Sequence, residues 1–274
     1  MGRIIAVTNQ KGGVGKTTTS VNLAASLAAS AKRVLLIDLD PQGNATTGCG
    51  VDKRRLVAST YGVLTGQWPL LAARLKLERL GLDLLGANGD LTRAEVGLLT
   101  ERGRETRLQT LLEPIAPMYD FIFIDCPPTL NMLTVNALVA AHAVIIPIQC
   151  EYYALEGLSA LRETVAGIRK RFNPQLEIAG LLRTMVDTRS NLANDVSTQL
   201  TQRFGTQVYD TVIPRNVRLA EAPSHGLPAL FYDRASSGAL AYQALAAEIL
   251  RREAGAPGLA APQRETNPTI PATP

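Results

Sequence analysis

A glycine-rich stretch near the start of the chain has the residue types needed to bind a polyphosphate. The glycines permit a tight turn in which backbone N–H groups face phosphate, and the helix expected over residues 21–29 would point its positive end at the same place. Lys16 can supply charge to the outer phosphates, and the Thr17 hydroxyl can ligate Mg²⁺. An apolar strand, residues 4–7, precedes the turn, which is the context of a phosphate-binding loop. The stretch reads Lys11-Gly12-Gly13-Val14-Gly15-Lys16-Thr17-Thr18.

Three aspartates are the candidate acidic partners of this loop. Asp38 ends the apolar run 33–38, Asp40 follows it in a turn, and Asp125 ends the apolar run 121–125. Ligands of α/β sheets sit at the carboxyl ends of the strands, so we expect all three near the phosphates. Asp125 has the Walker B arrangement and can hold Mg²⁺ or its water. Asp38 has an alternative role as a helix-capping or loop carboxylate, whereas for Asp40 we favour a functional role.

Composition restricts the class of protein. The chain has 274 residues and 46% hydrophobic residues, enough for one large domain with a buried core. No apolar run approaches the roughly 20 residues of a membrane span, and no signal segment precedes the first strand, so we expect a cytoplasmic protein. Cys49, Cys126 and Cys150 lack C-x-x-C spacing and are typical of reduced thiols. The net charge of +4 is weak evidence for a polyanion, so nucleic-acid binding would depend on where the charges lie.

Strand and helix patterns alternate along the chain. They predict one α/β domain, residues 1–253, with a mostly parallel twisted sheet and helices on both faces. The Pro-rich segment 254–274 predicts a disordered tail. Residues 102–118 have a helical pattern broken by prolines, and residues 212–216 look like a strand. The other expected strands are 82–86, 143–148 and 176–185, and the other expected helices are 60–64, 70–77, 130–141, 151–172, 191–204 and 237–252.

The glycine-rich loop departs from the usual Walker A pattern. The first glycine of that pattern would fall at Gln10, and a second lysine, Lys11, follows it. This resembles the deviant Walker A motif of the ParA/MinD/nitrogenase-iron-protein class of P-loop NTPases. Four more segments resemble the ParA/Soj-type partitioning ATPases, and the resemblance covers about residues 2–253. These segments are 38–44, 124–128, 149–157 and 212–224.

The resemblance implies an ATPase that uses ATP and Mg²⁺ and forms a homodimer around two ATP molecules. It implies that the ATP dimer binds double-stranded DNA without sequence preference and is therefore associated with the nucleoid. A ParB-type centromere-binding partner would stimulate hydrolysis and release the protein from DNA. The biological role would be segregation of chromosome or plasmid origins.

The resemblance also implies roles for individual residues. Lys11 would act on the nucleotide of the partner subunit, and Asp40 would orient the attacking water. Asp38, Asp125 and Thr17 would form the metal site, and Pro214, Arg215 and Asn216 would flank the adenine. Arg189 and Arg218 would contact DNA. From the residues alone, these arginines could equally be ordinary surface charges.

Two positions depart from the pattern of the family. Leu227 stands where relatives often carry lysine, and Ser237 stands where arginine is frequent. Both departures could weaken a DNA-binding patch. The chain starts directly at the ATPase motif, so we do not expect the sequence-specific autorepression of longer relatives.

Three alternatives remain at the level of the sequence. A MinD-like membrane-cycling ATPase would need a C-terminal amphipathic helix, and the Pro-rich tail argues against one. An iron–sulfur reductase would need two cluster cysteines, and the context of Cys126 and Cys150 does not match such a site. A DNA-binding protein that uses ATP only as a structural ligand would not need Asp40 and Asp125.

Overall fold

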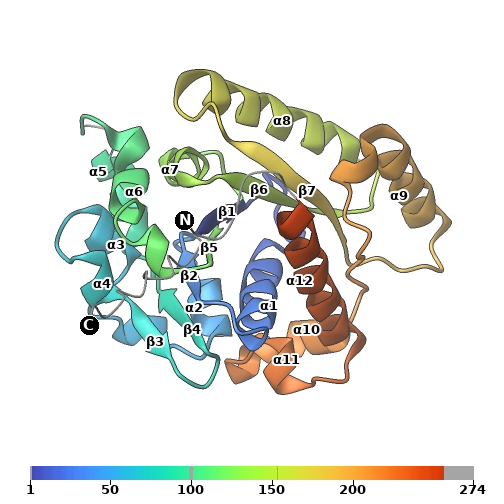
Figure 1. The fold of residues 1–274 in the computed structure, drawn as a ribbon, viewed down its shortest axis with the longest axis horizontal. Helices are drawn as coiled ribbons and strands as arrows, with labels where there is room; N and C mark the ends of the chain where they lie inside the picture. Colours follow the sequence, from blue (N-terminus) through green and yellow to red (C-terminus); the bar gives the residue numbers. More distant parts are fainter. Residues whose placement is uncertain (1, 99–100, 153, 256–274) are drawn as a thin grey trace, which may run out of the picture.

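The sheet at the centre of the molecule is seen in a computed structural model that describes residues 2–98, 101–152 and 154–255. Its strands lie in the order β3-β4-β2-β5-β1-β6-β7 (Figure 1). Every neighbouring pair is parallel except β3 and β4, so the predicted mostly parallel α/β fold is confirmed. The strands are β1 (Arg3–Val7), β2 (Val34–Asp38), β3 (Leu75–Leu77), β4 (Leu82–Leu85), β5 (Phe121–Asp125), β6 (Ala143–Gln149) and β7 (Glu177–Thr184).

Helices cover both faces of this sheet, as Figure 1 shows. One face carries α1, α11 and α12, and the other carries α7 and α8. The α-helices are α1 (Lys16–Ala29), α2 (Asn44–Gly48), α3 (Thr60–Leu64), α4 (Leu70–Ala73), α5 (Leu91–Leu98), α6 (Arg107–Leu112), α7 (Met132–Ala140), α8 (Ala154–Arg171), α9 (Asn191–Phe204), α10 (Val217–Glu221), α11 (Ala229–Tyr232) and α12 (Ser237–Gly255). Short 3-10 turns are η1 (Lys53–Arg55), η2 (Arg104–Thr106), η3 (Ala116–Met118), η4 (Gly205–Gln207) and η5 (Ala222–His225).

Two hydrophobic cores enclose the central strands. Along β1, Ile4 and Ala6 face the core on the α7 and α8 side, whereas Ile5 and Val7 face the core on the α1 side. The two-residue period of a strand sends successive side chains to opposite faces, so a strand buried on both faces must be apolar throughout. This explains the near-continuous apolar runs of β1, β2 and β5.

The register of the sheet places its functional ends in one row. Asp38 at the end of β2 lies opposite Asp125 at the end of β5, and Val7 at the end of β1 also lies opposite Asp125. The loop that follows Val7 is the predicted phosphate loop. Parallel pairing therefore brings together two aspartates and a glycine-rich loop that are far apart in the sequence.

Several sequence predictions differ from the structure. The helix expected over 70–77 ends at Ala73, and the chain then forms β3, which pairs antiparallel with β4. Gly81, at a φ of +67°, allows the tight turn between the two strands. Residues 91–98, for which no element was expected, form α5. Segment 212–216 is not a strand, since it contributes only a bridge between Pro214 and Val186, and proline has no N–H to extend a ladder.

The C-terminal helix extends past the domain boundary predicted at residue 253. α12 continues through Gly255, so residues 254–255 of the predicted tail are helical. The rest of that tail, residues 256–274, lies outside the described residues, and the boundary stays a prediction. Within the described ranges, no helix has both the length and the apolar character needed to cross a bilayer.

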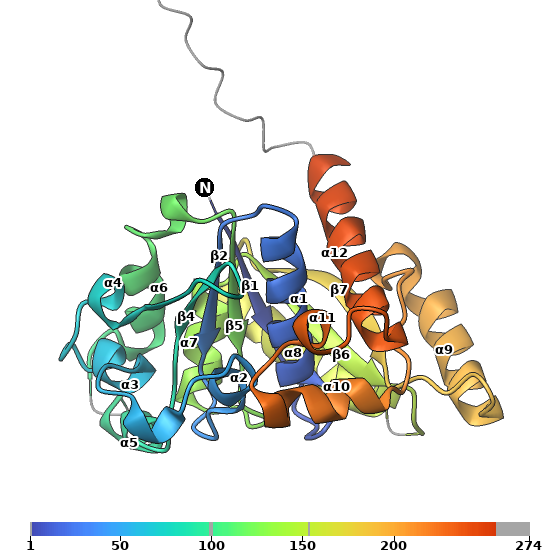
Figure 2. The ribbon, with the colours of Figure 1, turned by 90° about the horizontal axis from the view of Figure 1, so that it is seen from below.

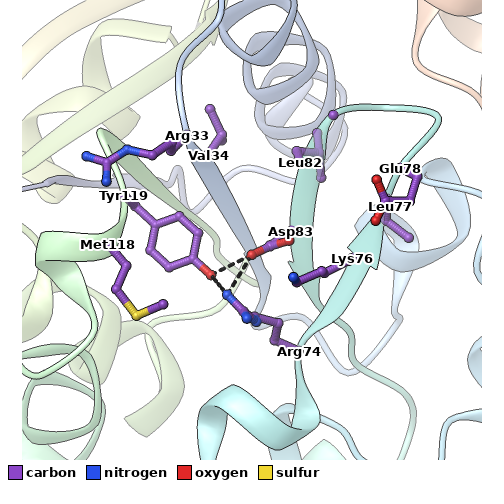
Figure 3. A pocket seen from close by; sticks show the side chains of 11 residues that line it. Arg33, Val34, Arg74, Lys76, Leu77, Glu78, Leu82, Asp83, Met118 and Tyr119 are labelled. Atoms are coloured by element: carbon purple, nitrogen blue, oxygen red, sulfur yellow. Dashed lines mark hydrogen bonds and ion pairs between the residues drawn. The ribbon is translucent and has the colours of Figure 1, made fainter.

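A partly buried polar triad fastens the β3–β4 hairpin to β5 at the amino ends of the strands (Figure 3). Tyr119 donates from its hydroxyl to Asp83 at 2.7 Å, and Arg74 donates to Asp83 and to the Tyr119 hydroxyl, both at 2.9 Å. The triad lines a hollow of about 450 Å³ at the edge opposite the aspartate row. Burial, together with the hydrogen bond to Asp83, raises the pKa of Tyr119 to about 12, so its hydroxyl stays a donor at neutral pH.

We expect Tyr119→Phe to lower the free energy of unfolding by about 1–2 kcal/mol, because the half-buried Asp83 carboxylate loses a donor. Urea denaturation monitored by circular dichroism would measure the change. Tyr61→Phe is the control, since it retains the ring that packs under Arg93. Equal stabilities of the Tyr119 and Tyr61 variants would show that the triad does not fasten the hairpin.

Candidate nucleotide-binding and hydrolysis site

The glycine-rich loop is held in shape from both sides. Gly13 and Gly15 have φ values of +73° and +89°, a region that L side chains rarely adopt. The Asn9 side chain accepts from Lys11 N–H at 3.0 Å and donates to the Pro147 carbonyl at 2.8 Å. Thr184 on β7 donates from its hydroxyl to the Val14 carbonyl at 2.8 Å. The loop is therefore preformed against the ends of β6 and β7.

The start of α1 is arranged to receive an anion. Gly15 is the N-cap residue and provides no side-chain cap, which leaves the N–H groups of the first turn available. Lys16 is only 7% exposed, and its ammonium donates to the Lys11 carbonyl at 2.9 Å. Burial lowers the pKa of Lys16, while the nearby Asp125, Cys126 and Asp40 oppose that shift. Lys16 is thus a buried cation on the inner side of the loop, near Asp125 and Asp40.

Asp125 is tied directly to α1. Thr17 donates from its hydroxyl to one carboxylate oxygen at 2.8 Å, and Ser20 donates to the other at 2.9 Å. Sequence reasoning predicted Thr17 and Asp125 for one metal site but missed Ser20. The helical period could have indicated it, because a residue three positions after Thr17 lies on the same side of α1.

Asp38 organises the loop that carries Asp40. One Asp38 oxygen accepts from Thr46 N–H at 2.8 Å and from the Thr46 hydroxyl at 2.7 Å, and the other accepts from Asp40 N–H at 3.2 Å. Asp40 in turn accepts from Gln42 N–H at 2.9 Å. Both roles considered for Asp38 fit this position, since it caps a loop and also lies beside Asp125; its role as a metal ligand stays a prediction.

The two strand-end aspartates suit a cation. Both are fully buried. Burial raises the pKa of each carboxyl, and the neighbouring Asp38 raises the pKa of Asp125 further. A bound cation would offset this repulsion, and carboxylate and hydroxyl oxygens are the donors that Mg²⁺ prefers. The residues present therefore fit a magnesium ion held near Thr17 and Asp125, with Asp38 behind them.

A second hollow lies on the other side of the loop and has the size of a purine subsite. It has a volume of about 190 Å³ and brings the predicted adenine-flanking residues beside Gly15 and Thr18. Asn216 donates to the Ser237 hydroxyl at 2.8 Å. Ser237, the position where relatives often carry arginine, therefore supports the wall of this pocket. The lining residues are Gly15, Thr18, Thr184, Met185, Ile213, Pro214, Arg215, Asn216, Leu219, Ala220 and Tyr242.

Lys11 differs from Lys16 in its surroundings. Its side chain is 43% exposed and pairs with Glu151 after β6. Gly12 beside it has open space, since a Cβ added there would meet nothing within 4 Å. This part of the loop therefore lies at the surface, where a second molecule can approach.

The two predicted DNA-contacting arginines lie on neighbouring segments. Arg215 N–H donates to the Val186 carbonyl at 3.1 Å, which joins the turn before α9 to the turn before α10. Arg189 is 88% exposed and pairs with Asp187, and Arg218 is 46% exposed and pairs with Glu221 and Asp233. Leu227 packs partly buried against the α1-side core, so its apolar side chain belongs to the protein interior.

The three cysteines are buried and free. Cys49 packs in the α1-side core, whereas Cys126 and Cys150 pack in the core under α7 and α8. Burial raises the pKa of each thiol. Among the described residues, no group of three or more His, Cys, Asp or Glu side chains is arranged to hold a metal ion.

The chain matches a known protein family and is similar in sequence to known proteins. The AAA domain family matches residues 2–178. The chain is 51% identical to the sporulation initiation inhibitor protein Soj of Bacillus subtilis, over 91% of this chain and 98% of Soj. It is 49% identical to the chromosome partitioning protein ParA of Caulobacter vibrioides, over 92% of this chain and 95% of ParA.

A solved structure extends the similarity to the fold. It is cobyrinic acid a,c-diamide synthase from Mycobacterium smegmatis with a bound ATP analog and magnesium. The two chains are 38% identical and superimpose with a TM-score of 0.82, over 93% of this chain and 97% of the other.

We expect Lys16→Ala to weaken ATP binding by at least about tenfold, because it removes the buried charge that faces the loop. Isothermal titration calorimetry with ATP and Mg²⁺ would measure the change. Lys170→Ala, an exposed lysine on α8, is the matched control. Affinity of the Lys16 variant equal to that of the control would contradict the assignment.

Proposed function

Because the chain belongs to the family of ParA/Soj chromosome-partitioning ATPases, we propose that its ATP-bound form is a homodimer that binds DNA without sequence preference. A ParB-type partner would stimulate hydrolysis and release the protein from DNA. The cycle would segregate chromosome or plasmid origins on the nucleoid in the cytoplasm. The observation that carries the proposal is the tie between Asp125 and the start of α1, which follows the phosphate loop, through Thr17 and Ser20.

The chain is an ATPase that works with ATP and Mg²⁺. When bound, Mg²⁺ neutralises charge on the phosphate oxygens during phosphoryl transfer. Thr17 and Asp125 would hold the ion, with Asp38 behind them. Lys16 and the N–H groups of the first turn of α1 would bind the outer phosphates, and Pro214 to Asn216 would flank the adenine.

Asp40 is the group we assign to the attacking water. It is 7% exposed, and its backbone is fixed by Asp38 while its carboxylate holds the following turn through Gln42. Phosphoryl transfer needs a positioned water and charge stabilisation more than covalent help from the protein. A nearly buried carboxylate on a fixed loop meets the first of these needs.

The Mycobacterium smegmatis protein is named a cobyrinic acid a,c-diamide synthase, which is an enzyme of amide synthesis. The relatives at 49% and 51% identity are a chromosome partitioning protein and a sporulation initiation inhibitor. This higher similarity favours partitioning over amide synthesis.

The exposed part of the loop supports dimerisation. Lys11 lies at the surface and its ammonium pairs with the half-exposed Glu151, so the side chain can turn toward the nucleotide of a second subunit. The open space at Gly12 lets a second loop approach closely. These features favour a dimer that forms across the carboxyl edge of the sheet, where α2 and α10 also lie (Figure 2).

The MinD-like alternative would replace DNA with a membrane. Two observations favour DNA over a membrane. The Caulobacter relative is named a chromosome partitioning protein, and Arg189 and Arg218 are exposed on adjoining segments, the turn before α9 and the start of α10. Co-sedimentation with liposomes in the presence of ATP would reveal the alternative.

We expect Gly12→Val to leave ATP binding largely intact and to block dimerisation. The added side chain enters free space within the monomer but occupies the approach of a second loop. Multi-angle light scattering with ATP and Mg²⁺ would measure the mass. Gly167→Val on α8, which also enters open space, is the control. A dimer of the Gly12 variant would exclude this geometry.

We expect Arg218→Glu to abolish DNA binding in the presence of ATP and to leave basal ATP hydrolysis nearly unchanged. Two copies of Arg189 and Arg218 would lie on one surface of the dimer, so affinity should fall steeply with salt and depend little on sequence. Mobility shifts on unrelated duplexes at two salt concentrations, with and without ATP, test this.

Arg171→Glu on α8 is the control for the change of net charge, because α8 lies on the other face of the sheet (Figure 1). The surface would be wrong if both variants lost DNA binding equally. It would also be wrong if the unmodified protein bound DNA equally well without nucleotide.

A further inference from the structure

Glu95 on α5 contacts the loop that follows Asp125. The Asn131 side-chain amide, at the end of this loop, donates from Nδ2 to Glu95 Oε1. Leu91, Ala94 and Leu98 bury the inner side of α5 in the core under α7 and α8, so α5 is a packed support. The carboxylate therefore joins a fixed helix to the loop 126–131, which begins beside the candidate metal site.

Both polar atoms of the Asn131 side chain form hydrogen bonds. Its Oδ1 caps α7 by accepting from Thr134 N–H at 3.0 Å, which leaves Nδ2 facing Glu95. Thr134 also donates from its hydroxyl to the Thr129 carbonyl at 2.6 Å. Glu95 thus contacts the junction of the loop and the start of α7 from its place on α5.

The segment before α5 contacts α2 and the turn that leads from Asp40 to α2, where a Cβ added at Gly43 would lie 2.5 Å from the Ala87 carbonyl oxygen. Ala87 N–H donates to the Thr46 hydroxyl at 2.9 Å, and Thr46 binds Asp38. Burial raises the pKa of Glu95, and the charge of Asp40 raises the pKa of Glu95 further. Across the described residues Glu95 forms no ion pair. Its carboxylate accepts a hydrogen bond from the neutral Asn131 amide.

We propose that Glu95 is a positioning residue for hydrolysis, which through its hydrogen bond to Asn131 holds the loop 126–131 in register with the Asp40 loop. This rests on the proposed roles of Asp40 and Asp125. The water is aligned only when the two loops keep a fixed separation, and α5 together with the segment that precedes it contacts both sides. Loss of the contact would lower turnover while phosphate binding at Lys16 and Gly15 is retained.

Exchanging the donor and the acceptor of the Asn131–Glu95 hydrogen bond tests this contact. Asn131→Asp retains the oxygen that caps α7 but sets a carboxylate against Glu95, and we expect kcat to fall about tenfold with KM for ATP within about twofold. Glu95→Ala should lower kcat similarly, and Glu95→Gln, which retains an acceptor oxygen, should stay close to the unmodified enzyme. The double variant Glu95→Gln with Asn131→Asp reverses the hydrogen bond and should restore kcat. Thr92→Ala, an exposed position on α5, is the control.

The outcomes separate this inference from the proposed function. The inference is overturned if the double variant is no faster than Asn131→Asp, or if Glu95→Ala matches Thr92→Ala. It is also overturned if the melting temperature falls in step with kcat across the set, because the contact would then serve stability alone. Absence of ATP turnover in the unmodified protein would instead overturn the proposed function.

Discussion

The structure depends on one unfavourable arrangement, two buried aspartates side by side at the ends of neighbouring strands. Asp38 and Asp125 are in register on β2 and β5, and burial in the sheet leaves them poorly solvated. Like charges in such a place destabilise each other unless hydrogen bonds or a cation compensate. The protein supplies Thr17, Ser20 and Thr46 as donors, and the remaining negative charge is what a bound magnesium ion would offset. Binding of a cation at this position would therefore also relieve the repulsion between the two carboxylates.

The hydrogen bonds that compensate the aspartates also shape the loops around them. Thr46 binds Asp38 and fixes the start of the segment that leads to α5, while Thr17 and Ser20 bind Asp125 from the first turns of α1. Because buried donors left without partners cost free energy, each loop is restricted to the geometry that satisfies the carboxylates. The site is preorganised for this reason, although its parts come from distant segments.

The sequence predicted those features that depend on local pattern. Apolar runs ending in Asp38 and Asp125 could be identified as buried parallel strands, and the spacing of glycines and lysines identified the loop. Features that depend on long-range partners could not be predicted. β3 becomes a strand only because it pairs with β4, and the roles of Thr46 and Glu95 follow from partners 8 and 36 residues away. The apolar spacing of Leu91, Ala94 and Leu98 is helical, but α5 has only eight residues, and so short a helix depends on its packing against the core for stability.

Polar contacts in this molecule differ in how readily they can be exchanged. Those of Asp38 and Asp125 lie in the interior, where breaking one leaves a charge without a partner or solvent. Those of Lys11, Arg189 and Arg218 are half-exposed or exposed, and each pairs with a carboxylate of its own chain. Ion pairs at the surface contribute little to stability, because water and salt screen both charges. A phosphate group can therefore replace such a carboxylate at small cost. The same chain can thus hold its buried acidic centre fixed while its surface cations stay accessible to the phosphate ligands that we propose for them.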